Sequence, residues 1–439
     1  MIRKYYLIGK LRDIKAVITM EKITAPRGTK DVLPEESRAW QILEEKLRSL
    51  AHRFGFREIR FPTFEDDALF DRGVGDTTDV VQKEMYDFYD KGDRHIALRP
   101  EGTASVVRAF IEHSLHAKGL PLKVYYIAPN FRYEKPQAGR LREHHQFGVE
   151  CFGAYDASAD AEVISLGATL LRELGITNTT LHLNSCGCKE CRKEYHAALK
   201  EYFKTKQDEL CDTCKDRLDR NPMRILDCKS DICKSIAKDA PKITDYLCDD
   251  CRAHFEKLRS YLDATGIAYE LDPMLVRGLD YYTNTVFEFV SGSLGAQSTV
   301  LGGGRYNGLV ETLGGPATAG LGFGCGIERL LLTLEAEGKL FSDRLVPDVF
   351  VAHAEERAES VSHALVYQLR ALGVSAERDT TGRSLKAQMK YAGKIGARYS
   401  AVIGGSEIDE GKITLKNMES GEQIECALTA DDIKASIGG

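Results

Sequence analysis

Long apolar runs are missing from this chain of 439 residues, and none approaches the roughly 18 residues that a membrane-spanning helix requires. Residues 1–20 carry five basic side chains but no apolar stretch of the kind found in signal peptides, so no export signal is predicted. Basic charge is not in excess either, because the formal net charge is -6. Indiscriminate binding to nucleic acid is disfavoured, and any RNA contact must come from local basic patches. We expect a cytoplasmic protein without a membrane partner.

The glycine motifs that hold nucleotides are also absent. The chain has no Gly-x-x-x-x-Gly-Lys-Ser/Thr segment, and Gly320, Gly322, Gly324 and Gly326 do not fit Gly-x-Gly-x-x-Gly. Neither a P-loop nor a Rossmann site is predicted. No Ser/His/Asp or Cys/His arrangement for nucleophilic catalysis stands out. If the chain binds ATP, arginines from separate strands must hold it, together with the helix that begins near Arg329.

Residues 129–150 predict a long hairpin. The aromatic and β-branched residues at 124–127 indicate one strand, and residues 146–152 indicate the returning strand. The loop between them carries four cations, Arg132, Lys135, Arg140 and Arg142. Planar guanidinium groups hold phosphate oxygens in pairs, which suits an anionic ligand in a cavity. A basic hairpin exposed to solvent would carry the same charges.

Four segments carry a resemblance to a known family. Residues 131–134 resemble motif 2 of the class II aminoacyl-tRNA synthetases, residues 56–65 resemble motif 1, and residues 322–330 resemble motif 3. Residues 275–282 are similar to the histidine-specific signature of the histidyl-tRNA synthetase family. The resemblance extends from about Pro26 to the C-terminus.

This resemblance implies a reaction in two steps. Histidine and ATP, with Mg2+, give histidyl-adenylate and pyrophosphate, and the histidyl group then moves to the terminal adenosine of tRNA(His). The substrate carboxylate is the nucleophile of the first step, which agrees with the missing nucleophilic arrangement. Catalysis then consists of positioning and of stabilising charge at the α-phosphate. The resemblance also implies a homodimer, with the motif 1 strand at the interface.

The same resemblance implies roles for individual residues. The catalytic set that it implies is Arg132, Arg277 and Arg329. The ATP-binding set is Arg132, Glu134, Arg140 and Arg329. The histidine-binding set is Glu101, Gly102, Thr103, Arg132, Gln146, Glu150, Arg277, Tyr281 and Tyr282. Without the resemblance, residues 99–103 fit an ordinary proline-glycine turn that opens a helix equally well.

The order of elements favours an α+β fold with an antiparallel sheet flanked by helices, because the helices are grouped apart from the short strands. Apolar residues at three- and four-residue spacing after Pro34 predict an amphipathic helix. Further strands are predicted at 95–98, 181–184, 275–277, 285–290 and 297–301. The glycines at 302–304 permit either a close approach to a ligand or an ordinary hairpin turn.

Four segments are predicted along the chain. Residues 1–20 form a leader, and translation starts at either Met1 or Met20. Residues 21–345 form the class II catalytic domain. Residues 186–263 are a charged, helical insert within it that contains nine of the twelve cysteines. Residues 346–439 form a compact α/β domain, which resembles an anticodon-binding domain.

Basic residues cluster in this C-terminal domain at Arg378, Arg383, Lys386, Lys390, Lys394 and Arg398. The three lysines recur every four residues and so share one helix face. In an anticodon-binding domain this stripe would meet the tRNA backbone. A solvated helix face would carry the same pattern.

The insert contains paired cysteines at the spacing of metal sites. One candidate set is Cys188, Cys191, Cys211 and Cys214, and a second is Cys228, Cys233, Cys248 and Cys251. Such thiolates suit tetrahedral zinc in a reducing cytoplasm, and a secreted disulfide scaffold is not predicted for so large a chain. The pairing between the sets stays open, as does the alternative of free thiols. The synthetase reaction itself requires no metal in this segment.

Two other functions fit parts of the sequence. A non-catalytic, histidine-sensing regulatory subunit of ATP phosphoribosyltransferase shares the catalytic fold, but such a protein resembles a synthetase with eroded motifs and no anticodon domain. A stand-alone RNA-binding protein would leave the cavity residues without a role. Histidine-dependent pyrophosphate exchange separates all three functions.

Overall fold

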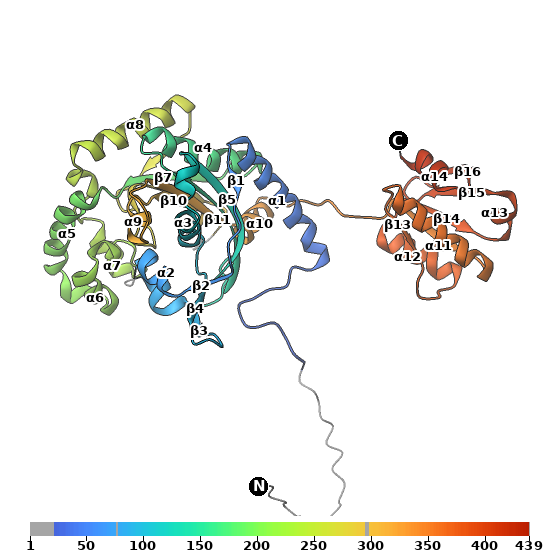
Figure 1. Cartoon of the computed structure of the whole chain (residues 1–439), viewed down its shortest axis with the longest axis horizontal. Coiled ribbons are helices and arrows are strands. Elements are labelled where there is room, and N and C mark those ends of the chain that lie inside the picture. The colour runs from blue at the N-terminus through green and yellow to red at the C-terminus, as the bar shows by residue number, and fades with distance from the viewer. Residues whose placement is uncertain (1–21, 76–77, 295–297, 439) are drawn as a thin grey trace, which may run out of the picture. The chain divides into compact units, whose positions relative to one another are not determined.

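The computed structural model describes residues 22–75, 78–294 and 298–438, and these fall into two compact units divided between Phe341 and Ser342. Figure 1 shows both units, coloured along the chain. The predicted leader and Gln297, the first residue of a predicted strand, lie outside the described residues. None of the described helices is long and apolar enough to cross a membrane.

An eight-stranded sheet forms the centre of the first unit (Figure 1). Its strand order is β1-β5-β6-β11-β10-β9-β7-β8. In that order the strands are Arg57–Glu58, Leu122–Phe131, Glu143–Phe152, Gly320–Gly326, Thr299–Arg305, Thr283–Ser291, Thr179–Ser185 and Glu270–Leu271. The six central strands are antiparallel, whereas the short edge strands run parallel to their neighbours. The predicted α+β architecture is confirmed, with a sheet that is mixed at its edges.

Helices cover both faces of this sheet. On one face, α1 (Pro34–Arg53), α4 (Ala157–Glu173) and α10 (Ile327–Ala336) contribute apolar residues to the largest core. On the other face, α3 (Thr103–Glu112) packs against alternate residues of β5, among them Tyr126. Because side chains alternate along a strand, the residues of β5 and β6 that face α3 lie on the opposite face of the sheet from those in the largest core.

A smaller antiparallel sheet leads into α3. Its strands, in the order β2-β4-β3, are Phe64–Asp66, His95–Leu98 and Tyr86–Tyr89. Its connections include α2 (Ala68–Phe70) and two π-helical turns, Asp71–Gly75 and Val80–Glu84. A 3-10 turn at Leu115–Lys118 follows α3, and α9 (Leu309–Thr312) follows β10. Strand β4 ends directly before the turn at Pro100 and so positions the start of α3.

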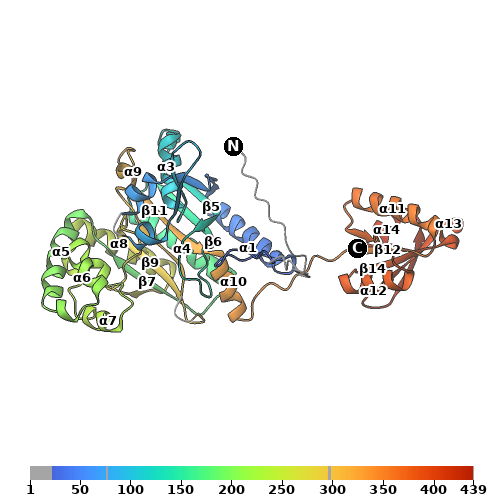
Figure 2. The ribbon, with the colours of Figure 1, turned by 90° about the horizontal axis from the view of Figure 1, so that it is seen from below.

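The cysteine-rich insert is helical. Most of its apolar residues form a second core that also includes Leu275 and Val286, whereas those of its last helix pack in the largest core. Its helices are α5 (Lys189–Lys204), α6 (Asp212–Arg220), α7 (Asp231–Ala237) and α8 (Asp249–Thr265), joined by 3-10 turns at Gln207–Glu209, Pro222–Ile225 and Ile243–Tyr246. Figures 1 and 2 show these helices gathered on the side of the sheet where β9 and β7 lie. The chain enters the insert from β7 and returns to β8, and these two strands pair directly.

One predicted strand is wrong, and one alternative that the sequence left open is decided. Residues 275–277 have no regular structure instead of a strand. Side chains bond their backbone: Asn184 donates to the carbonyl of Leu275, and Arg224 donates to that of Arg277. The glycines at 302–304 do not form a hairpin turn. They lie inside β10 and pair with strands on both sides.

The hairpin is also longer than its predicted strands. Strand β5 continues through Pro129 to Phe131, where its partner is Glu143 of β6. Strand β1 pairs only with residues 124 and 125, so β5 is an edge strand at Pro129. Proline is tolerated at such an edge because it has no N–H to donate to a further neighbour.

The second unit contains a five-stranded sheet in the order β13-β12-β14-β15-β16. Its strands, in that order, are Ala376–Arg378, Val349–His353, Tyr399–Ile403, Lys412–Asn417 and Gln423–Ala427. Its helices are α11 (Glu356–Ala371), α12 (Leu385–Ile395), α13 (Gly405–Glu410) and α14 (Ala430–Ile437). Strand β12 runs parallel to β13 and β14, and the remaining pairs are antiparallel. The three predicted stripe lysines lie on α12 and are exposed.

Candidate active site

Glycines open a recess in the face of the large sheet that α3 covers. A single row across β6, β11 and β10 consists of Gly148, Gly324 and Gly302. A Cβ atom at each would enter space held by the side chains of Tyr126, Gln146 and Arg277, respectively. At Gly302 the Cβ would lie 2.6 Å from Arg277 Nη1. Because these three residues are glycines, space stays open above the sheet at the site. Any larger residue would fill that space.

Two buried carboxyl groups lie in this region. Glu150 of β6 is 1% exposed, and it accepts hydrogen bonds from Thr103 Oγ1 at 2.8 Å and from the Tyr306 hydroxyl at 2.6 Å. Glu101 is 4% exposed and accepts from the backbone N–H groups of Thr103 and Ala104, both at 2.7 Å. Glu101 thus satisfies N–H groups at the start of α3, which a helix leaves without partners of its own.

Burial raises the pKa of both carboxyl groups. The pKa of Glu150 rises to about 8, because burial disfavours the charged form more than the two hydroxyl donors favour it. The pKa of Glu101 is raised for the same reason, against the backbone N–H groups that lower it. A cation bound beside these groups would reverse the shifts. The pocket is therefore matched to a ligand that carries an ammonium group or an imidazole N–H.

A cavity of about 260 Å3 begins at Gln146 and is lined by four arginines, Arg132, Arg140, Arg277 and Arg329. Glu134 is buried, pairs with Arg140 and lies 3.9 Å from Arg132. Arg132 Nε donates to the carbonyl of Pro100 at 2.8 Å, which fixes its direction. Such a concentration of guanidinium groups suits a phosphate chain.

The cavity also holds a neutral histidine. Burial and the nearby Arg132, Arg329 and Arg140 lower the pKa of His144 to about 3. Arg329 is anchored by donating to the carbonyl of Thr299 at 2.6 Å. The charge in the cavity at neutral pH therefore comes from the arginines and not from this imidazole.

Arg277 lies in the turn between β8 and β9, and the insert holds that turn. The Arg277 guanidinium pairs with Glu288 of β9. Arg224 of the insert donates to the carbonyl of Arg277 at 2.8 Å and to Asp280 Oδ1 at 2.7 Å. Asn221 donates to the same carboxylate at 3.1 Å. The position of Arg277 thus depends on contacts from outside the sheet.

The predicted site residues fall into the two adjoining spaces. The arginine cavity is lined by Arg132, Glu134, Arg140, Gln146, Arg277 and Arg329. The carboxyl pocket contains Glu101, Thr103, Glu150 and Tyr281, whose hydroxyl lies 3.5 Å from Glu101. The ring of Tyr282 lies 4.8 Å from that of Tyr281, and Gly102 packs against Tyr126. Two hairpin cations lie elsewhere: Lys135 is exposed, and Arg142 stacks on Tyr133 at 3.8 Å.

Known proteins resemble this chain over nearly its whole length. A family model described as histidyl-tRNA synthetase matches residues 28–330, and one described as an anticodon binding domain matches residues 348–434. A relative named histidine-tRNA ligase from Caldanaerobacter subterraneus subsp. tengcongensis is 56% identical over 94% of this chain and 99% of its own length. The chain belongs to the histidyl-tRNA synthetase family.

Further members of the histidyl-tRNA synthetase family give the same coverage. A relative of the same name from Clostridium novyi is 54% identical over 94% of this chain and 99% of its own length. The solved apo structure of S. aureus histidyl-tRNA synthetase is 40% identical and has a TM-score of 0.80, with 95% of this chain and 99% of that chain covered. The resemblance found in the sequence is therefore confirmed along nearly the whole chain.

Four side chains of this synthetase site lie outside the predicted set: Tyr126, Asn130, His144 and Tyr306. Asn130 Nδ2 donates to Gln146 Oε1 at 2.8 Å. Strand alternation predicts that Tyr126 and Asn130 share a face with Gln146, once the register of the hairpin is known. No comparable signal marks Tyr306, which reaches Glu150 from the end of β10.

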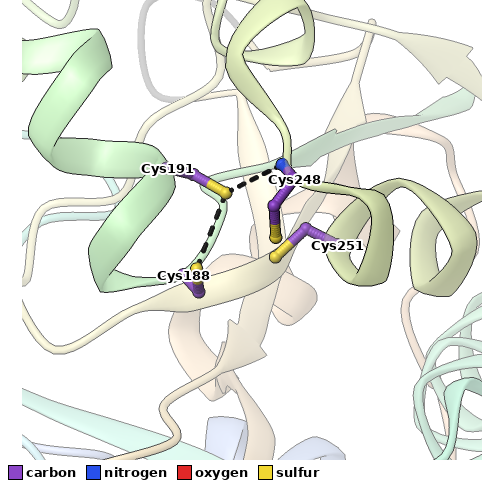
Figure 3. Close-up of side chains that lie close together, drawn as sticks. All are labelled: Cys188, Cys191, Cys248 and Cys251. Carbon is purple, nitrogen blue, oxygen red and sulfur yellow. Dashed lines mark hydrogen bonds between the residues drawn. The ribbon is translucent and has the colours of Figure 1, made fainter.

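Eight cysteines of this synthetase form two groups, and the groups correct the predicted sets. The first group is Cys188, Cys191, Cys248 and Cys251 (Figure 3), and the second is Cys211, Cys214, Cys228 and Cys233. Sequence order misassigns them because Cys188 and Cys248 precede α5 and α8, and the starts of these helices lie together. The cysteines between them belong to a separate part of the insert. All twelve cysteines are free of disulfides.

Proposed function

We propose that this chain ligates L-histidine to tRNA(His) and forms histidyl-tRNA, AMP and pyrophosphate from ATP. Membership of the histidyl-tRNA synthetase family gives the class II ligase activity, and the comparisons do not favour a non-catalytic regulatory subunit. One observation carries the assignment of the site: an arginine-lined cavity adjoins a buried carboxyl pocket on the same sheet face. The two spaces suit the phosphates of ATP and the cationic groups of histidine.

In the first step the histidine carboxylate attacks the α-phosphorus of ATP, and pyrophosphate leaves. Arg132 and Arg277 would hold the α-phosphate, and Arg329 would hold the remaining phosphates of ATP. Negative charge that develops on the phosphoryl oxygens is stabilised by donors already fixed in place. The buried Glu134 would provide oxygen atoms of the kind that Mg2+ bound to ATP prefers. No side chain needs to remove a proton, because the carboxylate is already ionised.

In the second step a ribose hydroxyl of the terminal tRNA adenosine attacks the histidyl carbonyl. The carbon–oxygen bond to the adenylate phosphate breaks, and AMP leaves with that oxygen. The arginines that held the α-phosphate then stabilise the leaving group. The proton of the attacking hydroxyl passes to an oxygen of the leaving phosphate or to water.

Histidine-dependent exchange of labelled pyrophosphate into ATP tests this function. Exchange is expected with histidine alone among the amino acids, because a pocket with buried acceptors rejects side chains that lack the matching N–H. A chain that binds histidine but exchanges no pyrophosphate would instead be a sensor.

Histidine binding is expected to release protons near pH 7. The pKa of Glu150 is about 8, so this carboxyl group is mostly protonated at pH 7 before the ligand binds. A bound cation lowers that pKa and expels the proton, so affinity for histidine should rise from pH 6 to pH 8. Proton release should vanish by about pH 9, where Glu150 of the free enzyme is already ionised. Calorimetry in buffers of different ionisation enthalpy measures the number of protons released.

The matched control for this measurement is Glu150→Gln, which keeps the size of the side chain and removes its titration. The difference in proton release between the two proteins is the contribution of Glu150, because the titration of histidine itself is common to both. Equal proton release by both proteins would place the titrating group elsewhere.

We assign residues 21–345 to catalysis and residues 346–439 to anticodon binding, with α12 facing the tRNA backbone. Lys386, Lys390 and Lys394 are exposed on this helix. The model of an anticodon binding domain that matches residues 348–434 supports this assignment. These three lysines form no ion pair with any residue that the structure describes, so they are available to phosphates, in contrast to Arg398, which pairs with Asp348 at 3.1 Å.

Changing Lys386, Lys390 and Lys394 together to glutamine should weaken tRNA binding and flatten its dependence on salt. Each lost phosphate contact to single-stranded RNA reduces the slope of log K against log salt by about 0.7. Filter binding over a range of salt concentrations measures that slope, and pyrophosphate exchange should not change.

A triple variant of equal charge, Lys412→Gln with Lys416→Gln and Lys434→Gln, is the control. Those lysines lie on β15 and α14 of the same unit. If both triple variants share one slope, the effect is one of net charge and α12 is only a solvated face.

We also propose that two chains associate through the segment around β1. This strand ends the large sheet, and its two residues, Arg57 and Glu58, are exposed. An unpaired strand edge is a ready surface for another copy. Sedimentation equilibrium should give twice the mass of the chain, and a monomer at micromolar concentration would contradict the proposal. We also propose a cytoplasmic location, because the proposed reaction serves translation.

A further inference from the structure

Each cysteine group has the dimensions of a tetrahedral metal site. Around an ion with metal–sulfur bonds of about 2.3 Å, neighbouring sulfurs are about 3.8 Å apart. The Sγ atoms of Cys188 and Cys191 are 3.6 Å apart, and those of Cys211 and Cys228 are 3.8 Å apart. All four sulfurs of each group lie within 4.8 Å of one another. These separations exceed the roughly 2.05 Å of a disulfide and fit four ligands around one ion.

Helix N-termini present three of the four cysteine pairs. Cys188, Cys211 and Cys248 are the N-cap residues of α5, α6 and α8, and each has its partner cysteine three positions later in the first turn. The positive end of a helix dipole favours thiolates. The second pair member is buried in every case, so these sulfurs face the protein and not the solvent.

Backbone N–H groups also point at the sulfurs. The N–H of Cys248 donates to Cys191 Sγ at 3.1 Å, and the N–H of Cys211 donates to Cys233 Sγ at 3.4 Å. The N–H of Ser230 donates to Cys228 Sγ at 3.5 Å. Hydrogen bonds of this kind hold metal-bound ligands in orientation and reduce the repulsion among four thiolates.

We propose that the insert binds two structural Zn2+ ions, one in each cysteine group. The base site is Cys188, Cys191, Cys248 and Cys251 (Figure 3), and the distal site is Cys211, Cys214, Cys228 and Cys233. Four thiolates in a tetrahedron select zinc or iron. A cluster of several irons would hold the sulfurs farther apart than this. Four protein ligands leave no position for water or substrate, so the role of each ion is structural.

The base site fastens the insert to the catalytic sheet. Asn284 of β9 donates its side-chain N–H to Cys251 Sγ at 3.4 Å. The backbone of Asn284 also bonds the chain just before α5: its carbonyl accepts from the N–H of Cys186 at 2.6 Å, and its N–H donates to the carbonyl of Gly187 at 3.0 Å. Strand β9 begins one residue after Tyr282. An ion in the base site would therefore hold the strand that adjoins the histidine pocket.

The distal site supports the turn that carries Arg277. The segment between Cys214 and Cys228 contains Asn221 and Arg224, which hold this turn through its backbone and through Asp280. An ion bound by cysteines at both ends of this segment keeps Arg224 within hydrogen-bonding distance of the turn. Arg224 is then a positioning residue. This part of the inference rests on the proposed function, whereas the two metal sites do not.

Elemental analysis of the full chain, purified without chelator, should give two zinc ions per chain. Two double variants, each lacking two cysteines, then test the grouping. Cys191→Ser with Cys251→Ser affects only the base site and should leave one zinc. Cys191→Ser with Cys214→Ser affects both sites and should leave well under one. Cys186→Ala, a buried cysteine of the same insert outside both groups, should keep two.

Less than one zinc in the parent chain, or iron in its place, would overturn the proposal. The opposite ranking of the two double variants would overturn the grouping. Cobalt titration of the unmodified chain after chelation covers the case in which a variant does not fold. Two equivalents of Co2+ should develop the visible absorption of tetrahedral thiolate coordination, and its absence would also overturn the proposal.

The positioning role has its own test. Cys214→Ser with Cys228→Ser should retain one zinc and lower pyrophosphate exchange by about 10²-fold, the cost of misplacing a catalytic group by about 1 Å. Arg224→Met should give the same loss with two zinc ions still bound. Undiminished exchange in both variants would overturn the positioning role alone. Failure of the proposed function would appear differently, as an unmodified chain with two zinc ions and no exchange.

Discussion

Replacing Arg277 with histidine is expected to lower histidine-dependent pyrophosphate exchange by about 10²- to 10³-fold, the usual cost of losing one donor to a charge that develops in the transition state. Arg277 shares its cavity with Arg132 and Arg329, and its guanidinium is anchored by Glu288. An imidazole is shorter, is mostly neutral above pH 7 and has no fork of parallel N–H donors. It cannot take over the contact with the α-phosphate.

The loss at Arg277 should be confined to adenylate formation. Binding of tRNA should be retained, because the predicted contacts of the anticodon lie in the second unit. The fold should persist as well, since Glu288 also accepts from Thr299 Oγ1 at 2.9 Å and keeps that partner. Arg277→Lys supplies charge without the fork of parallel donors. Its exchange rate should fall between those of the parent chain and Arg277→His. Exchange near the parent rate in Arg277→His would remove Arg277 from the catalytic set.

Adding one methyl group at Gly302 is expected to lower exchange by about 10²-fold, because a displacement of about 1 Å at a catalytic group has that cost. The new Cβ would lie 2.6 Å from Nη1 and 2.8 Å from Cζ of Arg277. Its nearest neighbours all belong to the end of that side chain, so the guanidinium must move while the backbone stays in place. Gly302→Ala should therefore fold normally, as judged by circular dichroism, and still lose activity.

A double-mutant cycle identifies the route of this effect. If Gly302→Ala acts only through Arg277, it should cost nothing further in an Arg277→His background. Gly303→Ala is the contrasting control, because a Cβ there would strike the backbone of Gly322 and Phe323 and should disrupt the sheet itself. Losses that add independently would show that Gly302 affects the site by another route.

The sequence predicts most reliably those features that are carried by contiguous residues. The hairpin, the helix after Pro34 and the motif around Arg132 each combine local propensity with local chemistry, so a short segment contains the signal. The carboxyl pocket is different. Tyr306 reaches Glu150 only because β10, β11 and β6 are neighbours, and such adjacency is not written in any one segment.

Two errors have the same physical origin. The apolar residues near Leu275 have strand propensity, but side chains of Asn184 and Arg224 satisfy the backbone there and the ladder is not needed. Order along the chain predicts one grouping of the cysteines, whereas the actual groups depend on which helix starts lie together. Tertiary contacts decide both cases, and propensity or spacing alone does not contain them.

Strands β7 and β8 pair directly, although the whole insert lies between them in sequence. The chain therefore leaves the sheet and returns to it one strand spacing away, and the cost of closing that loop in chain entropy grows only with the logarithm of its length. The apolar residues of α5, α6 and α7 pack in a cluster apart from the largest core, whereas Phe255, Leu258 and Leu262 of α8 belong to that core. Because the ends of the insert are also adjacent, these three helices can unfold without disturbing the register of the strands that flank the insert. We expect thermal denaturation of this chain to show an early transition for α5, α6 and α7, and its midpoint should fall when the base and distal sites are emptied.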